Sequence, residues 1–279
     1  MELDHQSEAP PSGAMIPFPP GPLTTIGQGP LAVDIAAQAG GRLAQITWEG
    51  TDWLVDGSAG QSAMIAWGCY PMAPWAGRIR HGRFAFRDRN YQLPLNLDGH
   101  AIHGVAFGLP WRVEAHSPSH AELSLALPVD ERWPFGGTCF QRIEAGDRQL
   151  RMSLSVSAGA LAMPVVIGWH PWFRKPDRVE FSPTHMYPRD AEGIATRPLA
   201  QPDPGPWDDC FINRRPVLIH RSGQSLRLTS SCSHWVVYDE VAHATCFEPQ
   251  SGPPDGFNIE PAWLPPGATI AAWFLMEWL

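Results

Sequence analysis

Hydrophobic and polar residues alternate with a period of two along much of the chain. In residues 150–157, Leu, Met, Leu and Val alternate with Arg and Ser, and three leucines alternate in the same way in residues 121–128. Residues 225–231 and 269–279 are also strand-like. Because successive side chains of a strand point to opposite faces of a sheet, these segments predict strands with one face in a core and one in water.

Turn residues separate the predicted strands at short intervals. Gly, Asp, Asn, Pro and Ser mark these turns in residues 48–53, 86–91, 114–123, 143–150 and 220–226. No long window has an apolar stripe at helical spacing, and the middle of the chain contains no repeat of fixed length and no low-complexity linker. The sequence therefore predicts an all-β fold, a large antiparallel β-sandwich.

The beginning of the chain differs from the rest. It is rich in Pro, Ser and acidic residues, and we expect residues 1–22 to form a flexible arm. Residues 23–279 are then expected to form a single β-sandwich domain, since all-β folds of this length are often one domain. The 30 Pro and 26 Gly fit short strands joined by turns, and the 13 Trp offer rings to a flat ligand.

Composition narrows the range of partners. A formal net charge of −8 argues against nucleic acid, since phosphate binding needs clustered Lys and Arg. No apolar run reaches the length of a membrane span, and residues 1–15 lack the pattern of a secretory signal. The five cysteines are widely spaced and odd in number, which fits free thiols in a reducing compartment. We therefore expect a cytoplasmic monomer or homodimer.

One histidine lies in an unusual setting. His170 stands between Trp169 and Pro171, with Trp172 and Phe173 just beyond. Pro171 restricts His170 to extended backbone and removes a donor from the ladder, so we expect His170 where regular strand pairing stops. Taken alone, this pattern is more typical of a buried structural histidine. The alternative is a catalytic acid beside an aromatic platform on which the apolar face of a sugar could stack.

A carboxylate occupies a similar position further along the chain. Alternation places Cys246 and Glu248 on one face of a predicted strand, and Pro249 is expected to end its pairing. Glu248 could be a solvated strand end, or a base held rigidly ahead of a Pro-rich loop. Glu260 also precedes a proline, but no strand leads into it, and it ranks well below Glu248.

Four further polar residues could contribute to a site. His100 and His103 are three residues apart, which on a strand places them on opposite faces, so they could share a metal only if the backbone curls. Arg78 and Asp208 each lie near a tryptophan. Surface charge is the common interpretation, but an Arg and an Asp that converge on a pocket can also bind vicinal hydroxyl groups in forked pairs.

Five segments, taken in order, resemble the aldose 1-epimerase (galactose mutarotase) family, and the resemblance runs from about residue 30 to the end of the chain. They are GCYPMAPWAGRIRHGRFAF (68–86), AIHGVAFGLPW (101–111), GWHPWFR (168–174), WDDCF (207–211) and CFEPQSGPPDGFN (246–258). The resemblance implies a single large β-sandwich of the mutarotase type. It also implies interconversion of the α and β anomers of an aldose, with a monosaccharide as the substrate and without a metal or an organic cofactor.

The resemblance also implies roles for individual residues. Glu248 matches the general base of the family and His170 matches its general acid. His103 matches a second active-site histidine, which supports a sugar oxygen, and Arg78 and Asp208 match substrate-binding residues. Free Glu is ionised at neutral pH, and a nearby carboxylate raises the pKa of His, so we expect an ionised Glu248 and an at least partly protonated His170.

Three positions depart from the pattern of the family. Gly77 replaces an Asn, Trp172 replaces a Tyr and Ser251 replaces a Thr. None of them removes a catalytic group, but they leave the preferred sugar open. Trp172 is a candidate substrate-binding residue, as a surface for stacking.

Three alternatives to a mutarotase remain from the sequence. Arg174 and Lys175 hint at a phosphorylated substrate, as in hexose-6-phosphate 1-epimerases, although paired basic residues in a loop are usually solvated. A sugar-binding β-sandwich without catalysis would keep the Trp-rich face. A cupin-like metal enzyme would use His100, His103 and His170.

Overall fold

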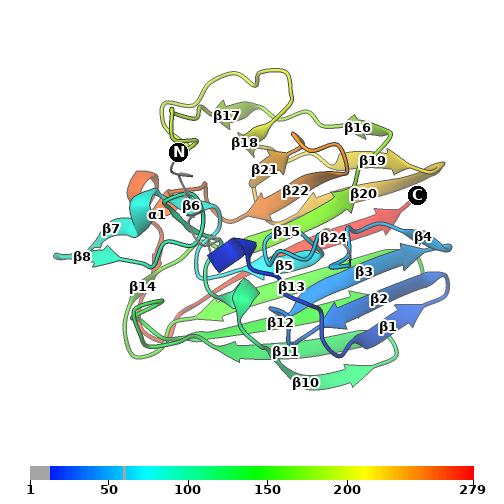
Figure 1. The fold of residues 1–279 in the computed structure, drawn as a ribbon, viewed down its shortest axis with the longest axis horizontal. Helices are drawn as coiled ribbons and strands as arrows, with labels where there is room; N and C mark the ends of the chain where they lie inside the picture. Colours follow the sequence, from blue (N-terminus) through cyan, green and yellow to red (C-terminus); the bar gives the residue numbers. More distant parts are fainter. Residues whose placement is uncertain (1–12, 59–60) are drawn as a thin grey trace, which may run out of the picture.

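Two large antiparallel sheets dominate the computed structural model, which describes residues 13–58 and 61–279 (Figure 1). Within these residues, the first sheet contains β1 (Thr24–Gln28), β2 (Leu31–Ala36), β3 (Arg42–Trp48), β5 (Cys69–Met72), β15 (Gly168–Arg174), β22 (Ala244–Gln250), β21 (His234–Tyr238), β18 (Asp208–Ile212) and β17 (His185–Tyr187) in spatial order, with β4 (Thr51–Asp52) paired to β3. The second sheet contains β10 (Arg112–Ser117), β11 (His120–Ala126), β12 (Thr138–Ala145), β13 (Gln149–Ser157), β24 (Thr269–Trp278), β20 (Gln224–Ser230), β19 (Val217–Arg221) and β16 (Arg178–Glu180).

Smaller elements lie around these sheets. The short pairs are β6 (Arg78–Ile79) with β9 (Ala101–Ile102), β7 (Arg83–Phe86) with β8 (Arg89–Gln92), and β14 (Met163–Pro164) with β23 (Trp263–Leu264). The helical segments are α1 (Gly256–Ile259) and the 3-10 turns η1 (Gly13–Met15), η2 (Arg80–Gly82) and η3 (Ala106–Gly108). None of the helices in the described part of the chain is long and apolar enough to cross a membrane.

The predicted β-sandwich is confirmed, and the alternating segments form the strands that the pattern predicts. In β13, Leu150, Met152, Leu154 and Val156 are all buried, while the Ser and Arg residues between them are partly exposed. The predicted strands at residues 121–128, 225–231 and 269–279 correspond to β11, β20 and β24. Hydrophobic burial on one face of each strand therefore determines the architecture.

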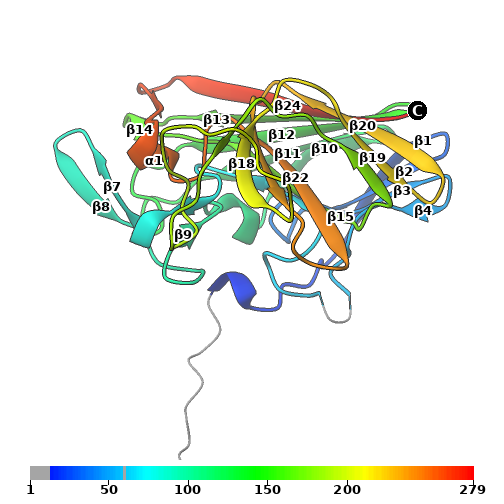
Figure 2. The same cartoon turned by 90° about the horizontal axis from the view of Figure 1, so that it is seen from above.

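The core lies between the two sheets (Figure 2). Trp169 of β15 and Trp235 of β21 reach across it to Phe274 of β24, with ring centroids 6.0 Å apart in both pairs. The buried indole nitrogen of Trp169 donates to Gln141 of β12, at 3.1 Å. Because neighbouring residues in a strand alternate between the faces, Trp169 in the core places His170 on the outer face of the first sheet.

Strand register gathers polar residues in two rows on this outer face. One row crosses four strands through Cys210, Val236, Glu248 and His170. The adjacent row crosses the same strands through Asp208, Tyr238, Cys246 and Trp172. Residues that are distant in the sequence therefore form one surface.

Strand pairing around His170 differs from the expectation. His170 belongs to β15 and is paired on one side with Tyr70 of β5, whereas on the other side the ladder to β22 is interrupted between Gly168 and Trp172. β22 also continues through Pro249, which is paired with Trp235. Pairing was predicted to stop at Pro171 and at Pro249. The prediction is correct at Pro171 for only one edge of β15, and it is wrong at Pro249. A proline lacks only its own N–H, and its carbonyl and its neighbours still pair.

Part of the predicted N-terminal arm is docked on the domain, while residues 1–12 lie outside the described residues. Ala14 is fully buried, and its carbonyl accepts a hydrogen bond from Ile65 N–H at 3.1 Å. The Ile16 carbonyl accepts from Met64 N–H at 2.9 Å, and Phe18 N–H donates to Ser62 at 2.7 Å. Residues 13–18 are therefore held by the backbone hydrogen bonds that a loosely draped arm would lack.

The β15–β22 contact generates a prediction at Gly168. A Cβ added there would lie 2.4 Å from the Pro249 carbonyl oxygen, so Gly168→Ala must push the two strands apart. We expect a loss of about 1–3 kcal/mol in the free energy of unfolding, measured with denaturant. The control is Gly159→Ala, whose Cβ would meet nothing closer than 3.7 Å. Equal stability of the two variants would contradict the prediction.

Candidate active site

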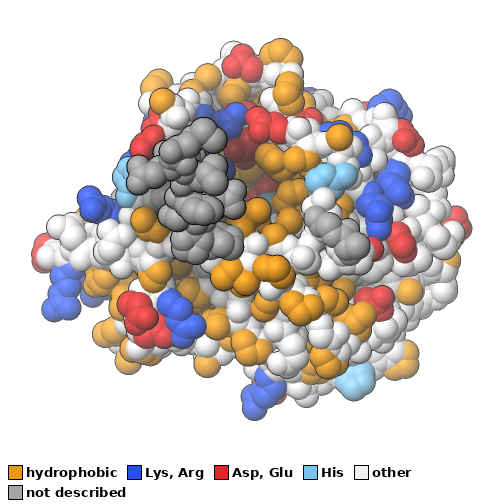
Figure 3. Space-filling view, viewed as in Figure 1, with side chains coloured by type: hydrophobic (Ala, Val, Ile, Leu, Met, Phe, Trp, Pro, Cys, Tyr) orange, Lys and Arg blue, Asp and Glu red, His pale blue; other side chains and the backbone are white. Residues whose placement is uncertain are grey.

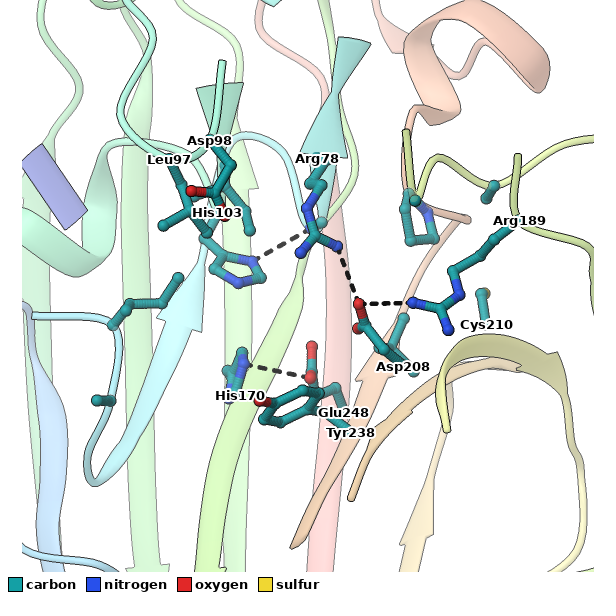
Figure 4. A pocket seen from close by; sticks show the side chains of 18 of the residues that line it. Arg78, Leu97, Asp98, His103, His170, Arg189, Asp208, Cys210, Tyr238 and Glu248 are labelled. Carbon is teal, nitrogen blue, oxygen red and sulfur yellow. Dashed lines mark hydrogen bonds and ion pairs between the residues drawn. The ribbon is translucent and has the colours of Figure 1, made fainter. Parts of the chain in front are cut away.

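The two rows, except Cys246, form the floor of a cavity of about 290 Å³ that opens on the outer face of the first sheet (Figure 3). Its lining includes all six predicted site residues: Arg78, His103, His170, Trp172, Asp208 and Glu248. Arg78 lies in β6 and His103 directly follows β9, so this small strand pair forms one wall above the sheet (Figure 4). The fold therefore brings these six residues together from five separate segments of the chain.

A contact between His170 and Glu248 lies at the centre of the floor. Gly168 is paired with Gln250 and Trp172 with Cys246, which puts His170 and Glu248 opposite each other in the interrupted part of the ladder. His170 Nε2 lies 3.2 Å from Glu248 Oε1. The other carboxylate oxygen, Oε2, accepts a hydrogen bond from Gln250 at 3.2 Å. Both partners are almost completely buried. The pair is therefore shielded from bulk water while it faces the cavity.

Burial reverses the charge states expected for this pair. It lowers the pKa of His170 to about 3. Burial, together with the negative charge of Asp208, raises the pKa of Glu248 well above its usual range. Both shifts favour the form of the pair in which the proton is on Glu248 and His170 is neutral, with the two groups within proton-transfer distance. Moving that proton to His170 creates a carboxylate and an imidazolium without any exchange with solvent.

Two aromatic rings hold the imidazole of His170. Tyr70 stacks on it with ring centroids 4.8 Å apart, and Trp172 stacks on it at 5.3 Å. A single carbonyl, that of Ile65, accepts from the Tyr70 hydroxyl at 3.0 Å and from the Trp172 indole at 2.7 Å. Because Ile65 N–H in turn donates to Ala14, the docked N-terminal segment is hydrogen-bonded to the residue that anchors both rings.

Trp172 lines the cavity and also packs against other protein rings. Its ring is only 7% exposed, and it stacks with His170 and also with His243, whose ring plane is tilted from it by 2°. These contacts hold the indole of Trp172 and the imidazole of His170 side by side. The binding of a sugar by Trp172 stays a prediction.

A buried cation supports this arrangement from below. The guanidinium of Arg42 lies 4.9 Å from the ring centroid of Tyr70 and 4.2 Å from that of Trp67. Its donors bond to the backbone carbonyls of Ala39, Met64, Trp67 and Phe107. Burial lowers the pKa of Arg42 to about 9. Four carbonyl acceptors and three aromatic rings, the third being that of Phe18 at 5.4 Å, compensate its desolvation. None of the described carboxylates is paired with it.

His103 is held by the turn that carries it. Its backbone is left-handed, with φ of 60°, and its Nδ1 accepts from Gly77 N–H at 3.3 Å. Burial lowers the pKa of His103 well below its usual range, so the ring is neutral and its proton is on Nε2. His103 can therefore donate a hydrogen bond to a ligand.

The glycine at position 77 fits this turn closely. Gly77 also has a positive φ of 69°, and a Cβ at this position would lie 2.6 Å from Pro254. Close packing on Pro254 explains physically why this chain has glycine where the family often has asparagine.

A network of charged side chains joins Arg78 of the β6–β9 wall to Asp208 of the floor and to Arg189 beside it. Asp208 Oδ2 accepts from Arg78 Nη1 at 3.4 Å and from Arg189 Nη1 at 2.9 Å (Figure 4). Arg189 also donates to Asp209, at 3.0 Å. Among the described side chains, none donates to Asp208 Oδ1. That oxygen and the remaining guanidinium hydrogens can therefore bind the hydroxyl groups of a ligand.

Four other candidates lie outside the cavity. Glu260 accepts from Tyr187 at 2.6 Å, and His100 accepts from the backbone N–H of His81 at 3.1 Å. Arg174 is paired with Asp56, at 3.1 Å. The Lys175 ammonium donates to backbone carbonyls in residues 239–244. The basic pair that suggested a phosphate is thus engaged elsewhere.

Of the described residues, the three histidines of the alternative metal enzyme do not form a potential ligand group, whereas His170, Cys246 and Glu248 do.

Several lining residues were missed from the sequence. Alternation places Val236 and Tyr238 on the same face of their strand. Only the pairing of this strand with β22 shows that this is the face that carries Glu248. Cys210 belongs to the same row. Arg189 has no signal of its own, because it lies in an irregular loop and reaches Asp208 only through the tertiary fold.

The fold and the cavity define a β-sandwich of the galactose mutarotase type. Of the solved structures, a putative aldose 1-epimerase from Escherichia coli K12 has a TM-score of 0.82 with 20% identity, covering 92% of this chain and 99% of that one. A galactose mutarotase-like protein from Clostridium acetobutylicum has a TM-score of 0.81 with 15% identity, covering 91% and 94%. The aldose epimerase homologue from C. elegans has a TM-score of 0.79 with 15% identity, covering 92% and 99%.

The sequence comparison identifies the family. A model of the aldose 1-epimerase family matches residues 22–277, so this chain belongs to that family. The uncharacterized protein YphB of Escherichia coli is 30% identical over 156 residues, which are 53% of this chain and 51% of YphB. The uncharacterized protein YihR of the same organism is 25% identical over 138 residues, 48% of this chain and 44% of YihR. The chain thus spans about half the length of the curated relatives that it matches.

The shared Ile65 carbonyl generates a prediction. Tyr70→Phe removes one of its two hydrogen bonds and should lower the free energy of unfolding by about 0.5–1.5 kcal/mol. The His170 imidazole resonances should also change in NMR spectra, because one ring that holds it loses its anchor. The control is Tyr91→Phe, in the β7–β8 hairpin. Unchanged His170 resonances in Tyr70→Phe would contradict the role of Tyr70 as a positioning residue.

Proposed function

We propose that this protein is an aldose 1-epimerase that interconverts the α and β anomers of a free aldose. The observation that carries the proposal is the buried His170–Glu248 contact, at 3.2 Å, on the floor of a cavity lined by polar groups, in a chain of this family. Ligand pockets span roughly 300–1,000 Å³, so a cavity of about 290 Å³ suits a monosaccharide.

The reaction requires two proton transfers together with the opening and closing of the sugar ring. In the reactive form the proton of the pair is on His170. Glu248, as the general base, removes the proton of the C1 hydroxyl, and His170, as the general acid, protonates the ring oxygen. The C1–O5 bond breaks, the open-chain aldehyde rotates about C1–C2, and closure on the other face returns both protons. The pair ends in its starting state, so an acid–base mechanism without a cofactor is sufficient.

The remaining side chains bind and orient the sugar. His103, a neutral donor through Nε2, supports the ring oxygen and stabilises charge that develops there. Arg78 and Asp208 bind hydroxyl groups, and Arg189 extends this network. Trp172 orients His170. The positive charges of Arg78 and Arg189 are balanced by Asp208 and Asp209, which favours a neutral sugar over a phosphorylated one.

A cytoplasmic location is part of the proposal. It is supported by the cysteines, all five of which are buried free thiols. A reducing compartment keeps such thiols from forming disulfides.

Glu248→Gln tests the proposal. Glutamine keeps the size of the side chain but cannot act as a base, so we expect anomer exchange to slow by about 10²–10⁴-fold. The measurement is polarimetry or NMR on freshly dissolved α-D-glucose and α-D-galactose, extended to a panel of aldoses and hexose 6-phosphates. The control is Glu260→Gln, which also precedes a proline but lies outside the cavity and should leave the rate unchanged.

The outcomes separate the candidate functions. Wild-type protein that exceeds buffer on no sugar, or a Glu248→Gln variant as fast as the wild type, would refute the epimerase. Binding of a sugar by calorimetry without exchange would favour a non-catalytic sugar-binding protein. Exchange restricted to 6-phosphates would favour a hexose-6-phosphate epimerase.

The pH dependence has a predicted sign. The reaction needs one proton on the pair, so the rate should fall at low pH when a second proton binds, and at high pH when the shared proton is lost. Burial lowers the pKa of His170 and raises that of Glu248, so the plateau should include neutral pH. Asp208→Asn removes a negative charge that opposes ionisation of Glu248. The alkaline limb of kcat/KM should therefore move to lower pH, and a shift to higher pH would contradict this assignment.

A further inference from the structure

A third side chain with ligand chemistry lies beside the His170–Glu248 pair. Cys246 precedes Glu248 by two residues in β22, so both side chains project from the same face. A ring nitrogen of His170, the sulfur of Cys246 and a carboxylate oxygen of Glu248 all lie within 4.8 Å of one another. The acid–base mechanism has no use for the thiol, which is fully buried.

We propose that His170, Cys246 and Glu248 form an inhibitory binding site for a thiophilic divalent cation such as Zn²⁺ or Cd²⁺. Imidazole nitrogen, thiolate sulfur and carboxylate oxygen are the donor types with which proteins bind Zn²⁺. Three protein ligands leave one position of a tetrahedral ion open. Because His170 and Glu248 line the cavity, that position faces the cavity, where water or a sugar hydroxyl can occupy it.

The pairing of β15 with β22 places the three side chains next to one another. Glu248 lies opposite His170 and Cys246 lies opposite Trp172, so His170 and Cys246 are diagonal neighbours across one pair of strands. Donor atoms bound to one tetrahedral Zn²⁺ are roughly 3.5 Å apart, given bond lengths of about 2.0–2.3 Å. The separation of up to 4.8 Å is therefore closed by rotation of side chains, without any change in strand pairing.

Charge balance selects a divalent ion. When the ion binds, the thiol of Cys246 and the His170–Glu248 pair each release one proton to solvent. The thiolate and the carboxylate then carry one negative charge each and the imidazole is neutral, so a 2+ ion gives a complex without net charge. A buried site tolerates a neutral complex far better than a charged one. Monovalent and trivalent ions leave a net charge.

Inhibition follows from the ligands used. The ion would occupy the acid and the base together, so neither could exchange a proton with a sugar. Sugar and ion should therefore compete. Only this inhibitory consequence rests on the proposed epimerase function, because binding of the ion depends on the three side chains alone.

Titration with Cd²⁺ tests the site directly, on full-length protein purified without a histidine tag. Wild type should bind one Cd²⁺ by calorimetry, with the ultraviolet absorbance of a cadmium–thiolate bond. In Cys246→Ala the absorbance should disappear and the affinity should fall by more than about tenfold, since losing even an outer-shell partner costs about 10–100-fold. The matched control is Cys139→Ala, which removes an equally buried thiol from β12 of the other sheet and should bind Cd²⁺ like wild type.

The inhibition assay uses Zn²⁺ and anomer exchange. Zn²⁺ should inhibit wild type and Cys139→Ala at the same concentration, and Cys246→Ala should need more than about ten times as much. If Cys246→Ala does not fold, Cys246→Ser replaces it in both assays. Failure of wild type to bind Cd²⁺, a thiolate signal that persists in the Cys246 variant, or faster exchange with Zn²⁺ would each overturn the proposal. A protein inactive on every sugar would refute the epimerase, and the Cd²⁺ titration would still decide the site.

Discussion

A shift of one residue in the pairing of β15 with β22 would turn either His170 or Glu248 away from the cavity, because side chains alternate between the faces of a strand. The register that prevents this is held on both sides of the site. Gly168 is paired with Gln250 and Trp172 with Cys246, and Trp169 is anchored in the core by Gln141. Burial of the core face thus determines the register, and the register in turn brings the acid and the base together.

Low polarity around the pair determines its chemistry. A solvated Glu is ionised at neutral pH and its charge promotes protonation of a nearby His, whereas burial of this pair favours the form in which neither group is charged. The two forms differ by one proton transfer across 3.2 Å. The same burial raises the pKa of the neighbouring Cys246 and keeps its thiol neutral.

The sequence predicted the parts of the molecule that depend on local pattern. Alternation in residues 150–157 yielded a strand with the correct buried face, because the core selects that face. The six predicted site residues were taken from motifs and a family resemblance, and they line one cavity, although their roles stay predictions. The separation of an arm at residues 1–22 also stays a prediction, apart from the docking of residues 13–18.

The sequence could not predict what depends on long-range pairing. The break at Pro171 affects one edge of β15 only, which requires knowing its neighbours on both sides. Trp172 was expected to bind a sugar, which stays a prediction, but its hydrogen bond to Ile65, more than a hundred residues earlier, could not be foreseen. Arg189 is likewise held at the cavity by its hydrogen bond to Asp208. In each case the missing information is a contact between segments that are distant in the sequence.

The docked N-terminal segment has a thermodynamic consequence. Met15 lines the cavity, and Ala14 is hydrogen-bonded to Ile65, whose carbonyl anchors the rings around His170. Docking of residues 13–18 and occupation of the cavity therefore share a set of contacts. Linkage is reciprocal: whatever free energy the docked segment adds to the binding of a ligand, that ligand adds to the docking of the segment. Any ligand whose binding depends on these contacts thus stabilises the docking of residues 13–18 by as much as that docking stabilises the bound ligand.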